Sequence, residues 1–331
     1  MKSVKELFEA FRNKTVLVIG DVMIDSYIFG AKSKLSETAH PVINTNRKEK
    51  RLGGAANVAL NIQALGATPV LCSVVGDDRN GQIFERLLDY QGMPNKGIIR
   101  SQNRITTNKL RVMAGSQQLL RVDTEDVHPL VDLDRKALMH HILNLSKESD
   151  LIIFEDYDQG TVHSEIISET IKVARENNIP VAVDPKQRNF LNYEGANLFK
   201  PNVSDLENMN DQKLDLRSAE NLDKVINKLG KSVKADNYIV SLDGGNIYFK
   251  SSNGGKVYPS HQKGVADMSG VGNAVISIAG LGLTLGLEQD VLAELSSIVA
   301  GVVASYSGVV PINKEQVLKE ASESEILKKY F

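Results

Sequence analysis

The stretch DLIIFEDYDQGTVHSEIISETIKVARENNIPVAVDPK (150–186) decides the fold. Two apolar runs of strand length enclose a segment with helical periodicity, and an acidic residue follows the apolar core of each run. Strands that alternate with helices of about 10–15 residues predict a parallel sheet covered by helices on both faces. Polar residues just beyond the strands should then gather at one sheet edge, where open α/β sheets bind their ligands.

The same alternation extends along the chain. TVLVIGD (15–21) and PVLCSVVGDD (69–78) are strand-like, and helical patterns cover 53–67, 135–149, 163–178, 219–233, 271–286 and 289–306. Two β-rich interruptions, residues 27–51 and 98–123, predict a small separate sheet. We therefore expect one α/β domain over residues 1–331, with a mostly parallel central sheet, helices on both faces and a small β-sheet lid.

Composition excludes several classes of function. The 331 residues are 42% hydrophobic, and 39 Lys plus Arg nearly balance 41 Asp plus Glu, so no overall field favours nucleic acid or an anionic membrane. The amino-terminal segment lacks a signal-peptide core, and no uncharged apolar run is long enough to span a bilayer. We expect a soluble, cytoplasmic protein in which the single Cys72 is a buried strand thiol.

Polar residues recur just beyond the predicted strands. A single acidic residue in such a position is more often a helix cap or a solvated turn than a ligand-binding group. Recurrence after most strands favours a binding site at this edge of the sheet. The residues are Asp21, Asp25, Asp77, Asp156, Asp184, Lys186, Asn202 and Asp243.

A second signal is DMSGVGNAV (267–275), where Gly270-Val271-Gly272 precedes a long apolar helix. Backbone N–H groups at a helix start, opened by glycines, stabilise negative charge. The pattern does not complete the dinucleotide fingerprint G-x-G-x-x-G, because position 275 is Val, and the chain has no P-loop motif. The sequence therefore gives little support to the hypothesis that the protein is a nucleotide-dependent oxidoreductase.

These motifs together resemble a known family. RLGGAANVALNIQALGA (51–67), with GDD shortly after, is similar to the amino-terminal signature of the ribokinase-like (PfkB) carbohydrate kinases, and DMSGVGNAV is similar to their second signature, D-T-x-G-A-G-D. The resemblance spans about residues 14–310. GDVMIDSY, KLRVMAGSQQLLRVD and FEDYDQG look like the kinase half of ADP-heptose synthesis enzymes, which phosphorylate D-glycero-D-manno-heptose 7-phosphate at C1. We expect no adenylyltransferase domain.

The resemblance implies an ATP- and Mg²⁺-dependent sugar kinase and assigns roles to individual residues. The residues expected to contact sugar hydroxyls are Asp21, Asp25, Gly53, Gly54 and Asn57. The sugar's phosphate would be held by lid residues, for which a solvated strand face is the alternative: Lys109, Arg111, Gln117 and Gln118. Asp156 and Lys186 would face the cleft between sugar and ATP. The amides of Gly270, Val271 and Gly272 would form the anion hole.

The chain departs from the family pattern around the expected nucleotide site. Asn273 stands where the family's last signature Asp takes the proton from the acceptor hydroxyl. The family's Asn-x-x-Glu, which organises magnesium through water, corresponds to Asn202-Val203-Ser204-Asp205. Further nucleotide-binding positions implied by the resemblance are Ser241, Asp243, Gly245 and Ser297.

Two functions remain open at this stage. One is an ATP-dependent sugar kinase that is impaired because an amide cannot act as a base. The other is a pseudokinase that binds a sugar phosphate or a partner protein without catalysis. Phosphoryl transfer depends mainly on positioning and charge stabilisation, so slow turnover can survive loss of the base. In either case, we expect a homodimer in which the lid sheet packs on its symmetry mate, because a small sheet outside the main domain cannot bury both faces alone.

Overall fold

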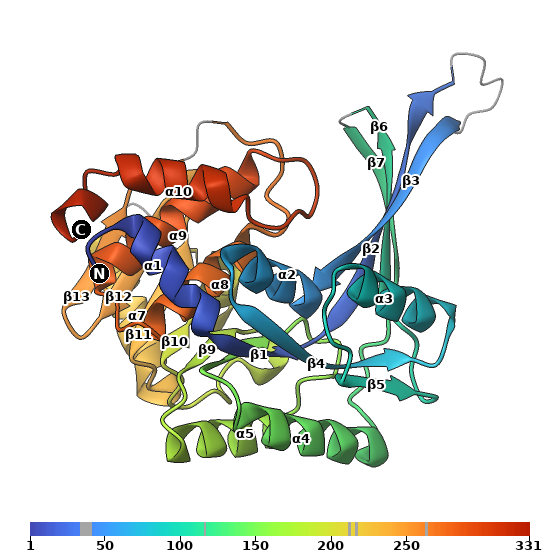
Figure 1. Ribbon diagram of the computed structural model, residues 1–331, viewed down its shortest axis with the longest axis horizontal. Coiled ribbons are helices and arrows are strands. Elements are labelled where there is room, and N and C mark those ends of the chain that lie inside the picture. Colours follow the sequence, from blue (N-terminus) through green and yellow to red (C-terminus); the bar gives the residue numbers. More distant parts are fainter. Residues whose placement is uncertain (34–41, 116, 211–212, 216–217, 262–263) are drawn as a thin grey trace.

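The computed structural model describes residues 1–33, 42–115, 117–210, 213–215, 218–261 and 264–331 (Figure 1). A nine-stranded sheet forms the centre of the molecule. In spatial order its strands are β13 (Gly254–Tyr258), β12 (Ile247–Ser251), β11 (Asn237–Ser241), β10 (Leu198–Phe199), β9 (Val181–Asp184), β8 (Leu151–Glu155), β1 (Thr15–Gly20), β4 (Thr68–Gly76) and β5 (Gly97–Ser101).

The sheet is mostly parallel, as the alternating sequence predicts. All neighbouring strands from β11 to β5 run parallel, whereas β12 and β13 form an antiparallel hairpin, and β12 pairs antiparallel with β11. Both faces of the parallel strands are apolar because helices cover both faces. In β8, for example, Ile153 packs into the core on one side and Phe154 into the core on the other.

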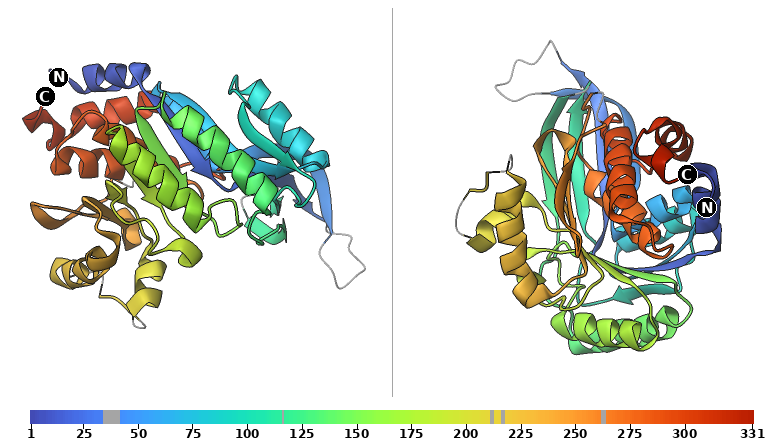
Figure 2. Two further views of the ribbon diagram at one scale, coloured as in Figure 1. Left: turned by 90° about the horizontal axis from the view of Figure 1, so that it is seen from below. Right: turned by 90° about the vertical axis from the view of Figure 1, so that its left-hand side faces the viewer.

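Helices form one layer on each face (Figures 1 and 2). The first layer contains α1 (Val4–Ala10), α2 (Ala55–Leu65), α3 (Arg79–Tyr90), α8 (Val271–Leu283), α9 (Gln289–Ala304) and α10 (Lys314–Glu323). The second contains α4 (Asp132–Ser146), α5 (Ser164–Glu176), α6 (Val203–Asn210) and α7 (Ala219–Val233). Among the described residues, no helix is both long and apolar enough to cross a membrane. Cys72 on β4 is fully buried, and burial raises the pKa of its thiol to about 12.

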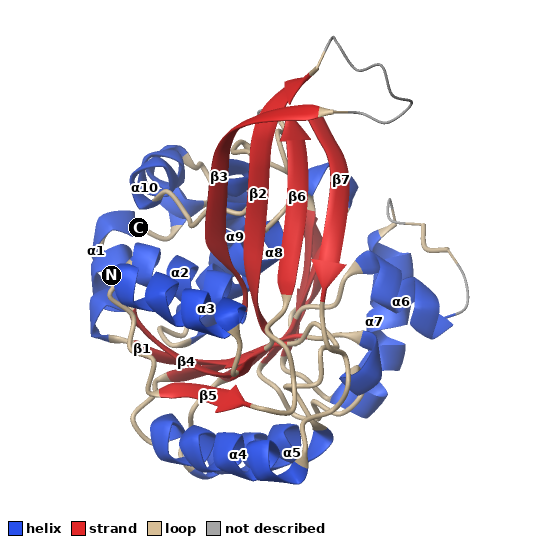
Figure 3. Cartoon of the chain, turned by 90° about the vertical axis from the view of Figure 1, so that its right-hand side faces the viewer, coloured by secondary structure: helices blue, strands red, loops and turns tan. Residues whose placement is uncertain are grey.

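A separate four-stranded sheet forms the lid, in the order β3-β2-β6-β7 (Figure 3). Its strands are β2 (Val22–Lys32), β3 (Ile43–Gly54), β6 (Asn108–Ala114) and β7 (Gln117–Thr124). Parts of the predicted lid segments, residues 34–41 and 116, lie outside the described residues.

The lid boundaries differ from the sequence-based expectation. The first segment begins at Val22 instead of residue 27, because β2 follows β1 almost without a loop. The second begins at Asn108 instead of residue 98, because β5 joins the edge of the main sheet. Ile98 and Ile99 explain this placement, since they pack against the cores on opposite faces of that sheet.

Candidate functional site

Two helices opened by glycine converge at the carboxyl edge of the sheet. Gly54 precedes α2 with a φ of 59°, and Gly270 precedes α8 with a φ of 84°, conformations that favour glycine. The helices pack against each other (Figure 1), and the Asn273 side-chain amide donates to the Gly54 carbonyl at 3.2 Å. The first N–H of each helix is already paired, that of Ala55 with the Asp21 carbonyl at 2.9 Å and that of Val271 with the Met268 carbonyl at 3.3 Å, so the Val271 amide does not point freely into an anion hole as predicted. The partial positive charge of both helix starts still favours an anion between them.

Asn57, on the first turns of α2, lies between the two helix starts. The residue is 1% exposed, and a Cβ added to Gly270 would lie 3.4 Å from its Oδ1. Its Nδ2 has no hydrogen-bond partner among the described residues. Buried polar groups are rarely left unpaired, so this donor fits a bound polar ligand. Gly53 lies against Asp25, where any Cβ would collide with the Asp25 carboxylate.

A row of charged side chains crosses the sheet beneath the Gly270–Gly272 loop. Glu155 ends β8 and pairs in register with Asp184 at the end of β9, and Lys200 follows β10 directly. The Lys200 ammonium lies 2.6 Å from Asp184 Oδ2, and both residues are buried. A Cβ on Gly272 would lie 3.3 Å from Lys200 Nζ, so a fixed positive charge lies under the loop.

Sequence reasoning did not assign Glu155 or Lys200 to the site. A signal for both was present, because each charged residue directly follows an apolar strand core in LIIFE (151–155) or NLFK (197–200). What the sequence did not give is the register that places them side by side.

Asp21 and Asp156 lie at the same edge, with their carboxylates bound to other protein groups. Asp21 accepts backbone hydrogen bonds from Tyr157 (2.8 Å), Gln159 (3.1 Å) and Thr161 (3.0 Å), which fixes the loop after β8. Asp156 Oδ2 accepts from the Asn189 amide at 3.0 Å and from the Tyr193 hydroxyl at 2.8 Å. Burial, together with the charge of Asp21, raises the pKa of Asp156 to about 6.

The base of the lid brings three of the predicted sugar-side residues together. Arg111 on β6 forms an ion pair with Asp25 on β2, and the Lys109 ammonium lies 3.6 Å from Glu125. Burial lowers the pKa of Arg111, but the charge of Asp25 outweighs it and the net pKa is raised. Asp25, which lies against Gly53, links Arg111 to the start of α2, and both cations are already paired with carboxylates.

Gln117 and Gln118 lie elsewhere. They pair with Ala114 and Met113 at the far end of the β6–β7 hairpin. Met113 is four residues along β6 from Lys109, a separation of roughly 13 Å in a strand. The structure does not bring these two side chains to the base of the lid.

The predicted nucleotide-side residues follow β9, β10 and β11 along the same edge. The Asn202 backbone donates to Asp205 Oδ2 at 3.2 Å, and Asp205 is buried at the start of α6. Ser241 ends β11, and its buried hydroxyl has no partner among the described residues. Ser297 on α9 donates to the Pro259 carbonyl at 2.7 Å. The half-buried Lys186 follows β9, and Gly245 is buried in the turn after β11. The Asp243 side chain lies outside the described part of the chain.

Asn273 is held from two sides in the first turn of α8. Besides the bond to Gly54, its Oδ1 accepts from the Tyr157 hydroxyl at 3.2 Å. An aspartate at 273 is nearly isosteric but loses the donor to the Gly54 carbonyl, so the exchange does disturb one contact that sequence reasoning did not foresee.

Asp267, the carboxylate that opens the DMSGVGNAV segment, is already bound to backbone donors. Its oxygens accept from the backbone of Ser269 at 2.9 Å and of Gly308 at 3.0 Å. Burial raises the pKa of Asp267, but these hydrogen bonds and the charge of Arg111 lower it below its ordinary value. The carboxylate holds the loop closed.

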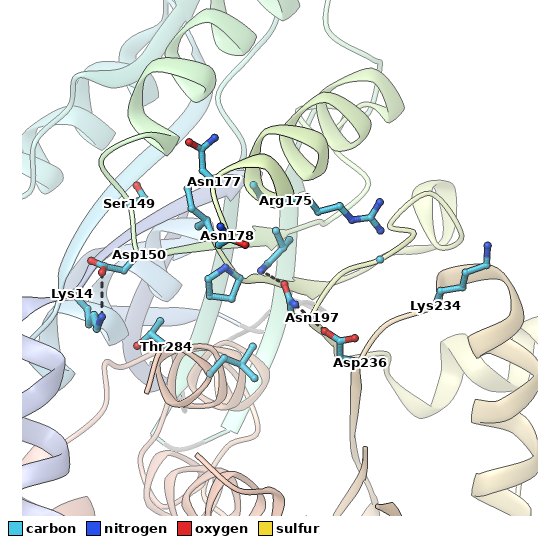
Figure 4. A pocket seen from close by; sticks show the side chains of 16 residues that line it. Lys14, Ser149, Asp150, Arg175, Asn177, Asn178, Asn197, Lys234, Asp236 and Thr284 are labelled. Atoms are coloured by element: carbon cyan, nitrogen blue, oxygen red, sulfur yellow. Dashed lines mark hydrogen bonds and ion pairs between the residues drawn. The ribbon is translucent and has the colours of Figure 1, made fainter. Parts of the chain in front are cut away.

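A cavity of about 790 Å³ lies at the opposite, amino-terminal edge of the sheet (Figure 4). Its lining includes the residues that precede β1, β8, β10 and β11, namely Lys14, Asp150, Asn197 and Asp236. None of the predicted site residues lines it. The candidate site is therefore the carboxyl edge, between the glycine-opened helices and the lid.

This arrangement defines the class of protein: an α/β fold with a mostly parallel central sheet, two glycine-opened helix starts and a separate β-sheet lid. Residues 13–316 match the pfkB family of carbohydrate kinases, and the chain belongs to that family. It is 34% identical over 305 residues to the bifunctional protein HldE of Helicobacter pylori, covering 92% of this chain and 66% of that protein. It is 32% identical over 319 residues to HldE of Pelobacter propionicus, and the match covers 96% of this chain and 65% of that protein. The chain spans about two thirds of the length of these relatives.

Solved structures of kinases share the fold. Phosphofructokinase-2 from Escherichia coli, in complex with substrates and products, superimposes with a TM-score of 0.78 at 16% identity, covering 92% of this chain and 97% of that one. The ribokinase of Arabidopsis thaliana, complexed with ribose and ATP, gives a TM-score of 0.72 at 15% identity, and the match covers 95% of this chain and 99% of the ribokinase. The predicted ribokinase-like fold is confirmed.

Proposed function

We propose that this protein is an ATP-dependent sugar-phosphate kinase of the heptose-7-phosphate 1-kinase type, working without a direct catalytic base. The observation that carries the proposal is the convergence of the Gly54 and Gly270 helix starts, bridged by Asn273, over the Lys200 ammonium. Backbone amides and one fixed cation stabilise the charge of a transferring phosphoryl group. The similarity to HldE proteins supports a heptose phosphate as the acceptor.

The sugar would lie under the lid. Asp25 and the unpaired amide of Asn57 offer hydrogen bonds to hydroxyl groups, Gly53 leaves room for close approach, and Asp21 holds the adjoining loop. Lys109 and Arg111 would exchange part of their pairing with carboxylates for the sugar's phosphate, which Arg can bind through two parallel hydrogen bonds. The lid sheet would also form the homodimer contact.

The nucleotide would lie across the ends of β9, β10 and β11. The orphaned Ser241 hydroxyl and the Asn202–Asp205 turn are polar groups suited to ATP and its magnesium ion, which Asp205 would organise through water. Oxygen ligands are the ones that magnesium prefers. The magnesium ion would neutralise phosphate charge, while Lys200 and the loop amides position the phosphates.

Turnover of ATP with D-glycero-D-manno-heptose 7-phosphate tests the proposal. We expect ADP release that depends on the sugar, with phosphorus NMR placing the new phosphate at C1. Fructose 6-phosphate and ribose serve as comparison acceptors. The second candidate, a pseudokinase, follows from Asn273 and predicts sugar-phosphate binding without ADP release.

A further inference from the structure

A buried carboxylate with one unpaired oxygen lies near the start of α8, where the family's base is replaced by Asn273. Glu155 is 1% exposed, and its Oε2 accepts no hydrogen bond from the described residues. It ends β8 on the face that carries Ile153, which packs in the same core as Val271 and Ala274 of α8. Side chains alternate across a strand, so Glu155 points toward the start of α8.

Tyr157 connects this carboxylate to Asn273. Its hydroxyl lies 3.2 Å from Asn273 Oδ1 in the first turn of α8. Burial and the charge of Asp184 raise the pKa of Glu155, whereas Lys200, a hydrogen bond from Tyr157 and Lys186 lower it, with a net rise. Burial, Glu155 and Asp184 also raise the pKa of the Tyr157 hydroxyl, so the phenol is neutral.

The other carboxylates of the site are already engaged. Asp184 is paired with Lys200, and Asp25 is paired with Arg111. The remaining three accept hydrogen bonds from the protein: Asp21, Asp156 and Asp267. Glu155 alone of these six has a buried oxygen with no partner among the described residues.

We propose that Glu155 is the proton acceptor of the kinase reaction, reached through the hydroxyl of Tyr157. The inference rests on the proposed function. The acceptor oxygen of the sugar bonds to the γ-phosphorus of ATP, and the bond from that phosphorus to the bridging oxygen breaks, its electron pair leaving with ADP. In the structure the single Tyr157 hydroxyl proton is directed at Asn273 Oδ1, and for the transfer the hydroxyl turns to Glu155. The sugar hydroxyl's proton then passes to the Tyr157 oxygen as the Tyr157 proton passes to Glu155, which becomes a neutral acid.

The relay predicts a pH dependence with a definite sign. Glu155 must be ionised to accept a proton, and burial together with the charge of Asp184 raises its pKa above that of an ordinary glutamate. Turnover should therefore rise with pH through a midpoint above that of an ordinary glutamate. Asp184, Lys200, Lys186 and Tyr157 are the charged or titratable groups that face it.

A double-mutant cycle tests the relay. Turnover of ATP with D-glycero-D-manno-heptose 7-phosphate is measured for the wild type, Glu155→Gln, Asn273→Asp and the double variant. We expect Glu155→Gln to lower kcat about 10-fold in the wild type, a part of the 10²–10⁴-fold that a general base contributes. In the Asn273→Asp background, the same change should cost less than about 2-fold, because a direct base makes the relay dispensable.

Two further variants separate catalysis from packing. Tyr157→Phe interrupts the relay, so it should lower kcat in the wild type and have little effect on kcat in the Asn273→Asp background. Glu294→Gln changes another buried glutamate that has an unpartnered oxygen, on α9, and should leave kcat unchanged. Both are checked for an unchanged melting temperature.

Several outcomes overturn the relay. The first is an equal loss of kcat from Glu155→Gln in both backgrounds, and the second is no loss of kcat when Glu155→Gln is made in the wild type. The third is that Asn273→Asp turns over ATP whereas the wild type does not. Turnover in neither protein, with heptose binding shown by calorimetry, overturns the kinase proposal as well. A kinase that turns over without dependence on Glu155 loses only the relay.

Discussion

The Tyr157 hydroxyl lies 3.2 Å from Asn273 Oδ1, which joins the loop after β8 to the start of α8 across 116 residues of sequence. Asn273 in turn reaches the Gly54 carbonyl at the start of α2. One amide side chain therefore ties together the three segments that surround the expected reacting groups. Its replacement affects both chemistry and stability.

Asn273→Asp should raise turnover and lower stability. A carboxylate next to the acceptor hydroxyl should increase kcat about 10²-fold, and the helix start tolerates its charge. The lost donor to Gly54 should cost about 1–3 kcal/mol, the penalty for leaving a buried acceptor unpaired. Steady-state kinetics and urea denaturation measure the two effects. Asn273→Ala, which loses the donor and adds no base, should lower stability without the gain; equal kinetics for both variants would contradict the prediction.

The buried Lys200–Asp184 pair should dominate local stability. Lys200→Met leaves an uncompensated carboxylate and should cost about 3–5 kcal/mol in the free energy of unfolding. The double variant Asp184→Asn/Lys200→Met should be more stable than the single one, because it removes both charges. The exposed pair Lys234–Glu194, at 2.7 Å, is the matched control, and Lys234→Met should leave the unfolding midpoint nearly unchanged. A single Lys200 variant as stable as the wild type would be incompatible with this account.

Asp156 should make stability fall as the pH rises from about 4 to 6. Its pKa is raised from 3.8 to about 6 in the folded protein, so the folded state binds the proton more tightly than the unfolded chain. This contribution is fully present below the unfolded pKa and is lost as the pH passes the folded pKa. The unfolding free energy of the wild type, relative to that of Asp156→Asn, should therefore fall by at most about 3 kcal/mol over this pH range, at 1.36 kcal/mol per pKa unit. Urea denaturation at both pH values checks it; a pH-independent difference would refute the assignment.

The lid should mediate dimerisation. Leu120 is 55% exposed and Val122 45% exposed on one face of the edge strand β7, a surface that packing on a second lid would cover. Light scattering at micromolar concentration should show a dimer. Leu120→Asp with Val122→Asp should yield a monomer, whereas Arg121→Ala, on the opposite face of the strand, should not. A monomeric wild type would rule this contact out.

A sugar phosphate should bind more tightly than ATP. Asp25, Gly53, Gly54 and Asn57 keep the sugar-side pattern implied by the family resemblance, whereas Asp205, Ser241 and Ser297 depart from its nucleotide-side pattern. Calorimetry with D-glycero-D-manno-heptose 7-phosphate and with ATP, each alone, measures the ranking. Micromolar ATP affinity without binding of any heptose or hexose phosphate would reverse it.

The sequence by itself determined the elements and the family. The apolar runs, the helical periods between them and the glycines at 53–54 and 270–272 are local signals, and each corresponds to a strand, a helix or a helix start in the structure. The family match over residues 13–316 agrees with the resemblance those motifs carried. The same signals placed the candidate site at the carboxyl edge of the sheet.

Only the tertiary structure decided which polar groups there are engaged and which are free. Sequence reasoning treated Asp21 and Asp156 as ligand contacts, whereas the structure shows their carboxylates bonded to backbone and side-chain donors. It also left Lys200 and Glu155 unassigned, although the first lies under the anion loop and the second has an unpaired buried oxygen. The reason is physical: a strand's own residues fix its faces, but the neighbours at its end depend on register with strands formed from distant segments.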